Sequence, residues 1–319
     1  MAGRLSIGGQ AVIEGVMMRS PKCIATAVRK ANGKIVYRKT KISDRANKLS
    51  KIPFIRGTVS LFESLVVGIK ELTFSAGQAD ESEEEISQKQ AIFTTIISLV
   101  LGIGLFIVLP SLVSSFIMKG NKLISNLIEG GMRLVIFVTY IWVISLSKDI
   151  KRVYEYHGAE HKSIAAYEHF AELKPENAKR YTKLHPRCGT SFLLMVRLIA
   201  ILVCSVADVF LPTPTSQLQR ILTRVGLRIA LMPIIAGISY ELQRYTGKHL
   251  DNKFIKIIAF PGLALQRITT REPDLSQLEV AIVAIKVSLE ETVDNATDIS
   301  EETFEDSKNI SESPNKIEA

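Results

Sequence analysis

The strongest chemical signal in the sequence is a pair of histidines with a glutamate between them, in the run Tyr156-His157-Gly158-Ala159-Glu160-His161. On a helix, His157 and His161 lie on one face and can hold one metal ion. The spacing His-x-x-Glu-His is the inverted form of a zinc-protease motif. In that chemistry the imidazoles bind zinc, and the carboxylate, here Glu160, takes a proton from water. A solvated surface helix is the alternative interpretation of so short a pattern.

A second cluster follows 24 residues after His161, in the run His185-Pro186-Arg187-Cys188. An imidazole and a thiolate are natural ligands for tetrahedral zinc, so we expect His185 or Cys188 to complete the site. Arg187 adds a positive charge beside them. The alternative is that Cys188 is a small apolar residue at a membrane surface and His185 an interfacial side chain.

Two further carboxylates are candidates for the same site. Glu241 ends an apolar segment and either supplies a ligand or pairs with Arg244, and we favour the ion pair. Glu14 lies among glycines and small apolar residues, where a carboxylate is unusual. We favour a structural role for Glu14 over entry into the site.

Long apolar segments must position these residues. The stretch 91–118 contains no charged residue, and a helix of roughly 20 such residues crosses a bilayer. Further apolar segments at 134–147, 192–211 and 225–242 predict a bundle of about four transmembrane helices. Charged side chains near the ends of the last two segments are expected to reach the membrane surface; these are Arg197, Asp208 and Arg228.

The regions between these helices predict a small mixed α/β part. Asn32-Gly33 between β-prone runs predicts a hairpin, and apolar spacing over 54–74 predicts a helix, either on the membrane surface or in a core. Pro261-Gly262 is expected to interrupt the apolar run 254–265. A helix over 276–289 is expected to be capped by Asp274 or Ser276.

We therefore expect a mainly α, polytopic membrane protein in six regions. They are a cytoplasmic N-terminal region (1–90), a first transmembrane pair (91–147), a His-rich cytoplasmic loop (148–190), a second transmembrane pair (191–242), a cytoplasmic or interfacial region (243–290) and an acidic disordered tail (291–319). The N-terminal region, the central loop and the C-terminal region would build the cytoplasmic part.

Charge sets the orientation and limits the partners. The net charge of the 319 residues is +8, but residues 287–319 carry −8, which leaves +16 for the rest. Basic residues concentrate before position 91 and in the loop 148–190. This distribution predicts a multi-pass protein of the cell membrane with both termini on the cytoplasmic side. We expect contact with membrane lipid and no nucleic-acid partner, since no nucleic-acid-binding module accompanies the basic charge. Three widely spaced cysteines exclude a disulfide-stapled secreted domain.

Four motifs together resemble the YqhQ-like family of bacterial membrane proteins. They are the runs from Gly8 to Arg19, from His157 to Lys162, from His185 to Ser191 and from Arg271 to Asp274. The resemblance covers about residues 3–290, and the acidic tail departs from it. Members of this family are sometimes labelled predicted metal-dependent enzymes. The resemblance therefore implies a metal site, but no reaction, substrate or catalytic residue.

Three functions follow from these observations. The first is a zinc-dependent hydrolase at the cytoplasmic membrane surface, in which Glu160 activates water and the substrate is a membrane peptide or a lipid-linked molecule. The second is a scaffold or assembly factor in which the same zinc is structural. The third is a lipid-handling or transport protein without metal, in which the charged residues of the transmembrane segments matter most. The sequence leaves the oligomeric state open.

Overall fold

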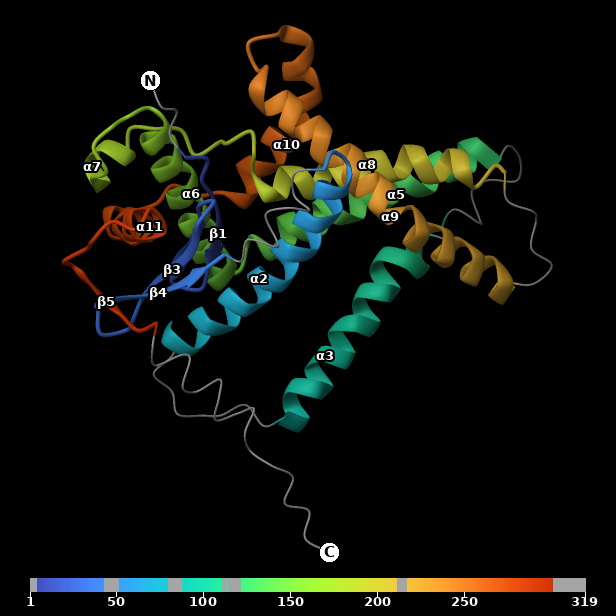
Figure 1. The fold of residues 1–319 in the computed structure, drawn as a ribbon. Helices are drawn as coiled ribbons and strands as arrows, with labels where there is room; N and C mark the ends of the chain where they lie inside the picture. Colours follow the sequence, from blue (N-terminus) through green and yellow to red (C-terminus); the bar gives the residue numbers. More distant parts are fainter. Residues whose placement is uncertain are drawn as a thin grey trace, which may run out of the picture.

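The computed structural model describes residues 5–42, 52–79, 88–110, 113, 122–210 and 217–300. This part of the chain is mostly helical and contains one small sheet (Figure 1). The strands are β1 (Gly8–Val12), β2 (Gly15–Arg19), β3 (Cys23–Arg29), β4 (Ile35–Lys41) and β5 (Ala296–Asp298). The helices are α2 (Ile55–Ala79), α3 (Gln88–Ile103), the π-helical turn η1 (Gly104–Val108), α5 (Lys122–Ile144), α6 (Lys148–Glu168), α7 (Pro175–Ala178), α8 (Gly189–Ala207), α9 (Gln217–Lys248), α10 (Lys253–Thr269) and α11 (Leu275–Ser288).

The sheet has the strand order β1-β2-β3-β4-β5, and its first four strands form an antiparallel meander. The predicted hairpin is confirmed as β3 and β4. Gly33 lies in its turn with a φ of 82°, a conformation that glycine adopts without steric cost. The fifth strand comes from the other end of the chain and pairs parallel to β4, with Val36 opposite Thr297.

Helices cover both faces of the sheet. Side chains alternate along β3, so Ala25 and Ala27 face α6 and α11, while Val28 faces α2 and packs with Phe74. Alanines on the first face let these helices approach the strands closely. The result is a three-layer unit in which α6 and α11 lie side by side on one face of the sheet and α2 lies on the other (Figure 1).

The apolar face of α2 points outward. Helix α2 confirms the predicted helix, but Phe62, Leu65, Val66 and Ile69 are each more than half exposed. Apart from Phe74, the residues that α2 buries against the sheet and α9 are small or polar, among them Gly57 and Glu71. The described part of the chain therefore does not bury this apolar face in a core, which favours the membrane-surface alternative.

Three helices are long and apolar enough to cross a membrane: Leu123–Ile144 in α5, Gly189–Ala207 in α8 and Val225–Lys248 in α9. They lie side by side and apart from the sheet (Figure 1). The expected first crossing, 91–118, lies partly outside the described residues, and its described part contains a shorter apolar helix, Ile96–Phe106. The structure thus supports a membrane protein with three candidate spans.

Other expectations differ from the structure at two places. Helix α10 runs through Pro261 without interruption, because it is capped at Asn252 and its buried face packs against α8. Residues 291–300, expected to begin a disordered tail, instead include β5 and the buried side chain of Ile299. Residues 301–319 lie outside the described part of the chain.

The charged side chains near the ends of the spans share one cavity, and their expected reach to the membrane surface stays a prediction. Arg197, Asp208 and Arg228 line a cavity between α5, α8 and α9. Their surroundings are treated below, because they form a site separate from the histidines.

Candidate metal centre

Helix α6 presents His157 and His161 from one face into the interior of the unit formed by the sheet, α2, α6 and α11. The helix begins after Ser147, and Asp149 in its first turn complements the helix dipole. His157 is 8% exposed and His161 is 1% exposed. The two imidazole rings lie edge to face with their centroids 4.5 Å apart. Spacing of four residues on a helix has therefore produced the shared face that the sequence predicts.

Backbone carbonyls fix the same tautomer in both rings. Nδ1 of His157 lies 2.8 Å from the carbonyl oxygen of Thr269, and Nδ1 of His161 lies 2.6 Å from that of Lys183. A carbonyl only accepts, so each Nδ1 carries the proton and each Nε2 keeps its lone pair. The Nε2 atom of His161 is buried without a hydrogen-bond partner among the described residues. Histidine ligands of metals are oriented in this way by an acceptor on the other ring nitrogen.

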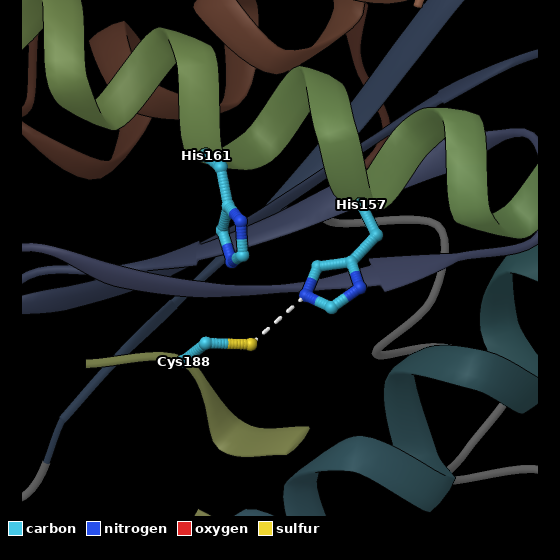
Figure 2. A group of neighbouring side chains, drawn as sticks. All are labelled: His157, His161 and Cys188. Carbon is cyan, nitrogen blue, oxygen red and sulfur yellow. Dashed lines mark hydrogen bonds between the residues drawn. The ribbon is translucent and has the colours of Figure 1, made fainter. Parts of the chain in front are cut away.

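Cys188 completes a three-residue cluster with the two histidines (Figure 2). One ligand atom from each of the three residues lies within 4.8 Å of the others, and Sγ of Cys188 is 3.2 Å from Nε2 of His157. Bond lengths of about 2.0–2.3 Å place tetrahedral zinc ligands roughly 3.5 Å apart, so a small inward movement suffices. Cys188 caps the N-terminus of α8, where the helix dipole favours an anionic group such as a thiolate.

Glu160 lies at the edge of this cluster and is 5% exposed. Its carboxylate oxygen is 3.9 Å from Nε2 of His157. Burial raises the pKa of Glu160 to about 7, although the charge of His157 and the backbone of Gly9 act in the opposite direction. Burial also lowers the pKa of His161, which keeps its imidazole neutral and able to bind a metal.

His185 and Arg187 lie beside the cluster and contact Glu168. The ring of His185 is 5.6 Å from that of His161, but its Nε2 lies 3.5 Å from Glu168, and its Nδ1 accepts the backbone N–H of Arg187. The guanidinium of Arg187 forms an ion pair with the same carboxylate. Burial favours a higher pKa for Glu168, but the hydrogen bond from His185 and the charge of Arg187 outweigh it and lower that pKa. Of the two expected ligands, only Cys188 joins the pair on α6.

The other two candidate carboxylates lie elsewhere. Glu14 occupies the β1–β2 turn with a φ of 50° and binds Arg152 and the hydroxyl of Tyr156, which fastens the hairpin to α6. Glu241 pairs with Arg56 of α2 through two hydrogen bonds, one of them 2.6 Å long, rather than with Arg244 as expected. Both are structural ion pairs between elements distant in the sequence.

Several residues that shape the site carry no sequence signal. Thr269 and Lys183 act through their carbonyl oxygens, which every residue type possesses. Gln266 is fully buried and holds the backbone of His185 through both its amide oxygen and its amide nitrogen. A glutamine in the apolar face of α10 was the one pattern that could have drawn attention to this bridge.

Comparison with known proteins gives the family but no activity. The model of the family described as "Protein of unknown function (DUF1385)" matches residues 52–291. The chain belongs to this family. It is also 36% identical over 293 residues to "Uncharacterized protein YqhQ" of Bacillus subtilis (strain 168), a match that covers 86% of this chain and 89% of that protein. The resemblance to the YqhQ-like family is thereby confirmed. No solved structure matches the chain.

Proposed function

We propose that this protein is a zinc-dependent hydrolase of the cell membrane, with its centre at the cytoplasmic membrane surface. The observation that carries the proposal is the pair of oriented histidines on α6 beside Cys188. Two neutral imidazoles and one thiolate suit zinc, whereas Mg²⁺ and Ca²⁺ prefer oxygen ligands. The proposed ligands are His157, His161 and Cys188.

Three protein ligands leave one position of a tetrahedral ion for water, which is the arrangement of catalytic zinc sites. Bound zinc supplies a water that ionises near neutral pH. Glu160 is the group placed to take the proton, because its carboxylate lies 3.9 Å from a ligand atom and points into the same buried region. Since the centre adjoins the start of α8, we propose a membrane peptide or a lipid-linked molecule as substrate.

The proposed orientation in the membrane follows from which segments of the chain share the sheet. Strands from both ends of the chain share one sheet, and α6 and α11 pack on it, so all of them must lie on the same side of a membrane. An even number of crossings must then separate β4 from α6. Helix α5 supplies one crossing, and we propose the segment 91–118 as the other, which gives four in total. The excess of basic residues in this unit favours the cytoplasmic side.

A metal analysis tests the site directly. The purified protein should contain about one zinc ion per chain, and the double variant His157→Ala/His161→Ala should contain almost none. The matched control is His169→Ala, because His169 ends the same helix outside the cluster, where its Nδ1 lies 2.7 Å from the carbonyl oxygen of Ala165. It should retain the metal. Equal metal in the wild-type protein and the double variant would overturn the proposal.

A structural zinc site is the second candidate, favoured by the burial of all four side chains around the centre. Replacing zinc by Co²⁺ distinguishes the two, because the visible spectrum of Co²⁺ reports its ligands. At a catalytic site added azide should change this spectrum, and Glu160→Gln should retain Co²⁺. A spectrum that azide leaves unchanged, with Co²⁺ lost in Glu160→Gln, would mean that Glu160 closes the site as a fourth ligand.

A further inference from the structure

A second site lies among the membrane-crossing helices. A cavity of about 150 Å³ opens between α5, α8 and α9. Its lining includes three arginines and two carboxylates, which are Arg133, Arg197, Arg228, Glu129 and Asp208. Charged side chains at membrane depth are costly and commonly mark functional sites. Arg197 lies nine residues along the chain from Cys188, about 14 Å on a helix, so this cavity is distinct from the metal centre.

The charges of the cavity do not cancel. Glu129 is 4% exposed and already has two cationic neighbours: it forms an ion pair with Arg133, and Arg228 lies 3.8 Å from the same oxygen. With three arginines and two carboxylates, the lining carries a net charge of +1. The cavity therefore favours an anion over a cation.

Arg197 is the group that lacks an anionic partner among the described residues. Its guanidinium lies 5.7 Å from the ring centre of Phe106 and 5.4 Å from that of Phe137, contacts that use the faces of the rings and leave its N–H donors available. The same side chain lines the cavity. A planar guanidinium binds carboxylate and phosphate oxygens through two parallel hydrogen bonds.

The cavity has room for such a group. One water needs about 10–15 Å³ on this scale, so 150 Å³ accommodates a tetrahedral oxyanion together with several waters. Met232 of α9 lines the cavity and is also 41% exposed, so it offers apolar surface at the cavity edge along which an acyl chain can lie. A headgroup in the cavity and a chain on this surface would satisfy both environments.

We propose that this cavity binds a phosphate group, presented by the headgroup of an anionic lipid or by inorganic phosphate. Arg197 is its principal ligand, and Arg133 and Arg228 provide the surrounding positive field. The site does not depend on the proposed hydrolase, because it shares no residue with the metal centre.

Binding measurements on the full-length protein in neutral detergent test the proposal. The probes are phosphatidylglycerol, a diacylglycerol with the same chains but no phosphate, and inorganic phosphate alone. Native mass spectrometry and the shift in thermal unfolding report binding. Phosphatidylglycerol should bind more tightly than diacylglycerol, and Arg197→Gln should weaken its binding about tenfold, the effect of one charge-assisted hydrogen bond. Arg197→Lys should retain part of the affinity.

The matched control is Arg244→Gln, which removes one exposed positive charge from α9 outside the cavity. It should leave binding unchanged. Binding of phosphatidylglycerol alone would identify a lipid headgroup site, and binding of inorganic phosphate as well would identify a general phosphate site. Equal affinity for phosphatidylglycerol and diacylglycerol would overturn the proposal, as would equal weakening by Arg197→Gln and Arg244→Gln. If Arg197→Gln does not fold, Arg228→Gln and the comparison of the two lipids still decide the matter.

Discussion

At the scale of single residues, the candidate metal centre depends on a position that has no side chain. Gly158 follows the first histidine on α6, and its Cα faces the carbonyl oxygen of Arg271. A Cβ built at this position would overlap that oxygen, so the close approach requires glycine. The same backbone segment brings Thr269 within reach of His157, which means that the glycine and the orientation of the ring are connected.

Replacing Gly158 by alanine should therefore loosen both the fold and the site. We expect a loss of about 1–3 kcal/mol in the free energy of unfolding, the usual cost of overpacking, and weaker zinc binding because the carbonyl of Thr269 is displaced. Thermal unfolding in detergent and metal content measure the two effects. Gly77→Ala is the control, because a Cβ at this exposed helical position meets nothing within 4 Å. Equal stability of the two variants would contradict the argument.

The sequence predicts the ligand types of this centre better than its geometry. The spacing of His157 and His161 requires only a helix, so the shared face could be inferred directly. The choice between His185 and Cys188 could not be inferred, because it depends on a tertiary contact. The imidazole of His185 lies against Glu168 and not against the pair on α6. The carbonyl oxygens of Thr269 and Lys183 could not be predicted as acceptors either, since every residue type has a backbone carbonyl.

At the scale of elements, α11 begins within one residue of the predicted start, and of the two expected caps the structure selects Asp274 over Ser276. Asp274 accepts the backbone N–H of Gln277, and the Gln277 side chain accepts the backbone N–H of Asp274 in return. This capping box satisfies two backbone donors that the helix itself leaves unpaired. The opposite case is β5, whose three residues, Ala-Thr-Asp, have no alternating apolar pattern and take their place through pairing with β4.

Asp274→Ala should lower the free energy of unfolding by about 1 kcal/mol at neutral pH, because the cap is lost. Burial favours a higher pKa for Asp274, but hydrogen bonds from Ser276 and Gln277 outweigh it and lower that pKa. The carboxylate therefore stabilises the fold above its unfolded pKa of about 3.9, and this contribution is lost as the pH falls through the lower folded value. Thermal unfolding at neutral and acidic pH should show the difference from wild type shrinking in acid. A difference that is independent of pH, or equal to that of the exposed Asp294→Ala, would refute the capping role.

At the scale of the whole molecule, the sheet links the two ends of the chain to the centre of the sequence. β1 contacts α6, and β4 pairs with β5, so segments separated by more than a hundred residues must meet on one side of the membrane. The sequence predicts the apolar segments and the bias in basic charge, but not this meeting, which requires knowledge of strand pairing. Because of this pairing, the number of crossings between β4 and α6, and between α6 and β5, must be even.

Cysteine labelling in intact cells tests this constraint. Asn32→Cys, in the exposed β3–β4 turn, should resist a membrane-impermeant thiol reagent until the membrane is opened, whereas Thr213→Cys, between the third and fourth proposed crossings, should react at once. The three native cysteines do not interfere because all are buried. Reaction of Asn32→Cys in intact cells, or protection of Thr213→Cys, would contradict the orientation. A cysteine at Asp251, in the α9–α10 turn, should behave like Asn32→Cys, because an even number of crossings returns the chain to the side of the sheet.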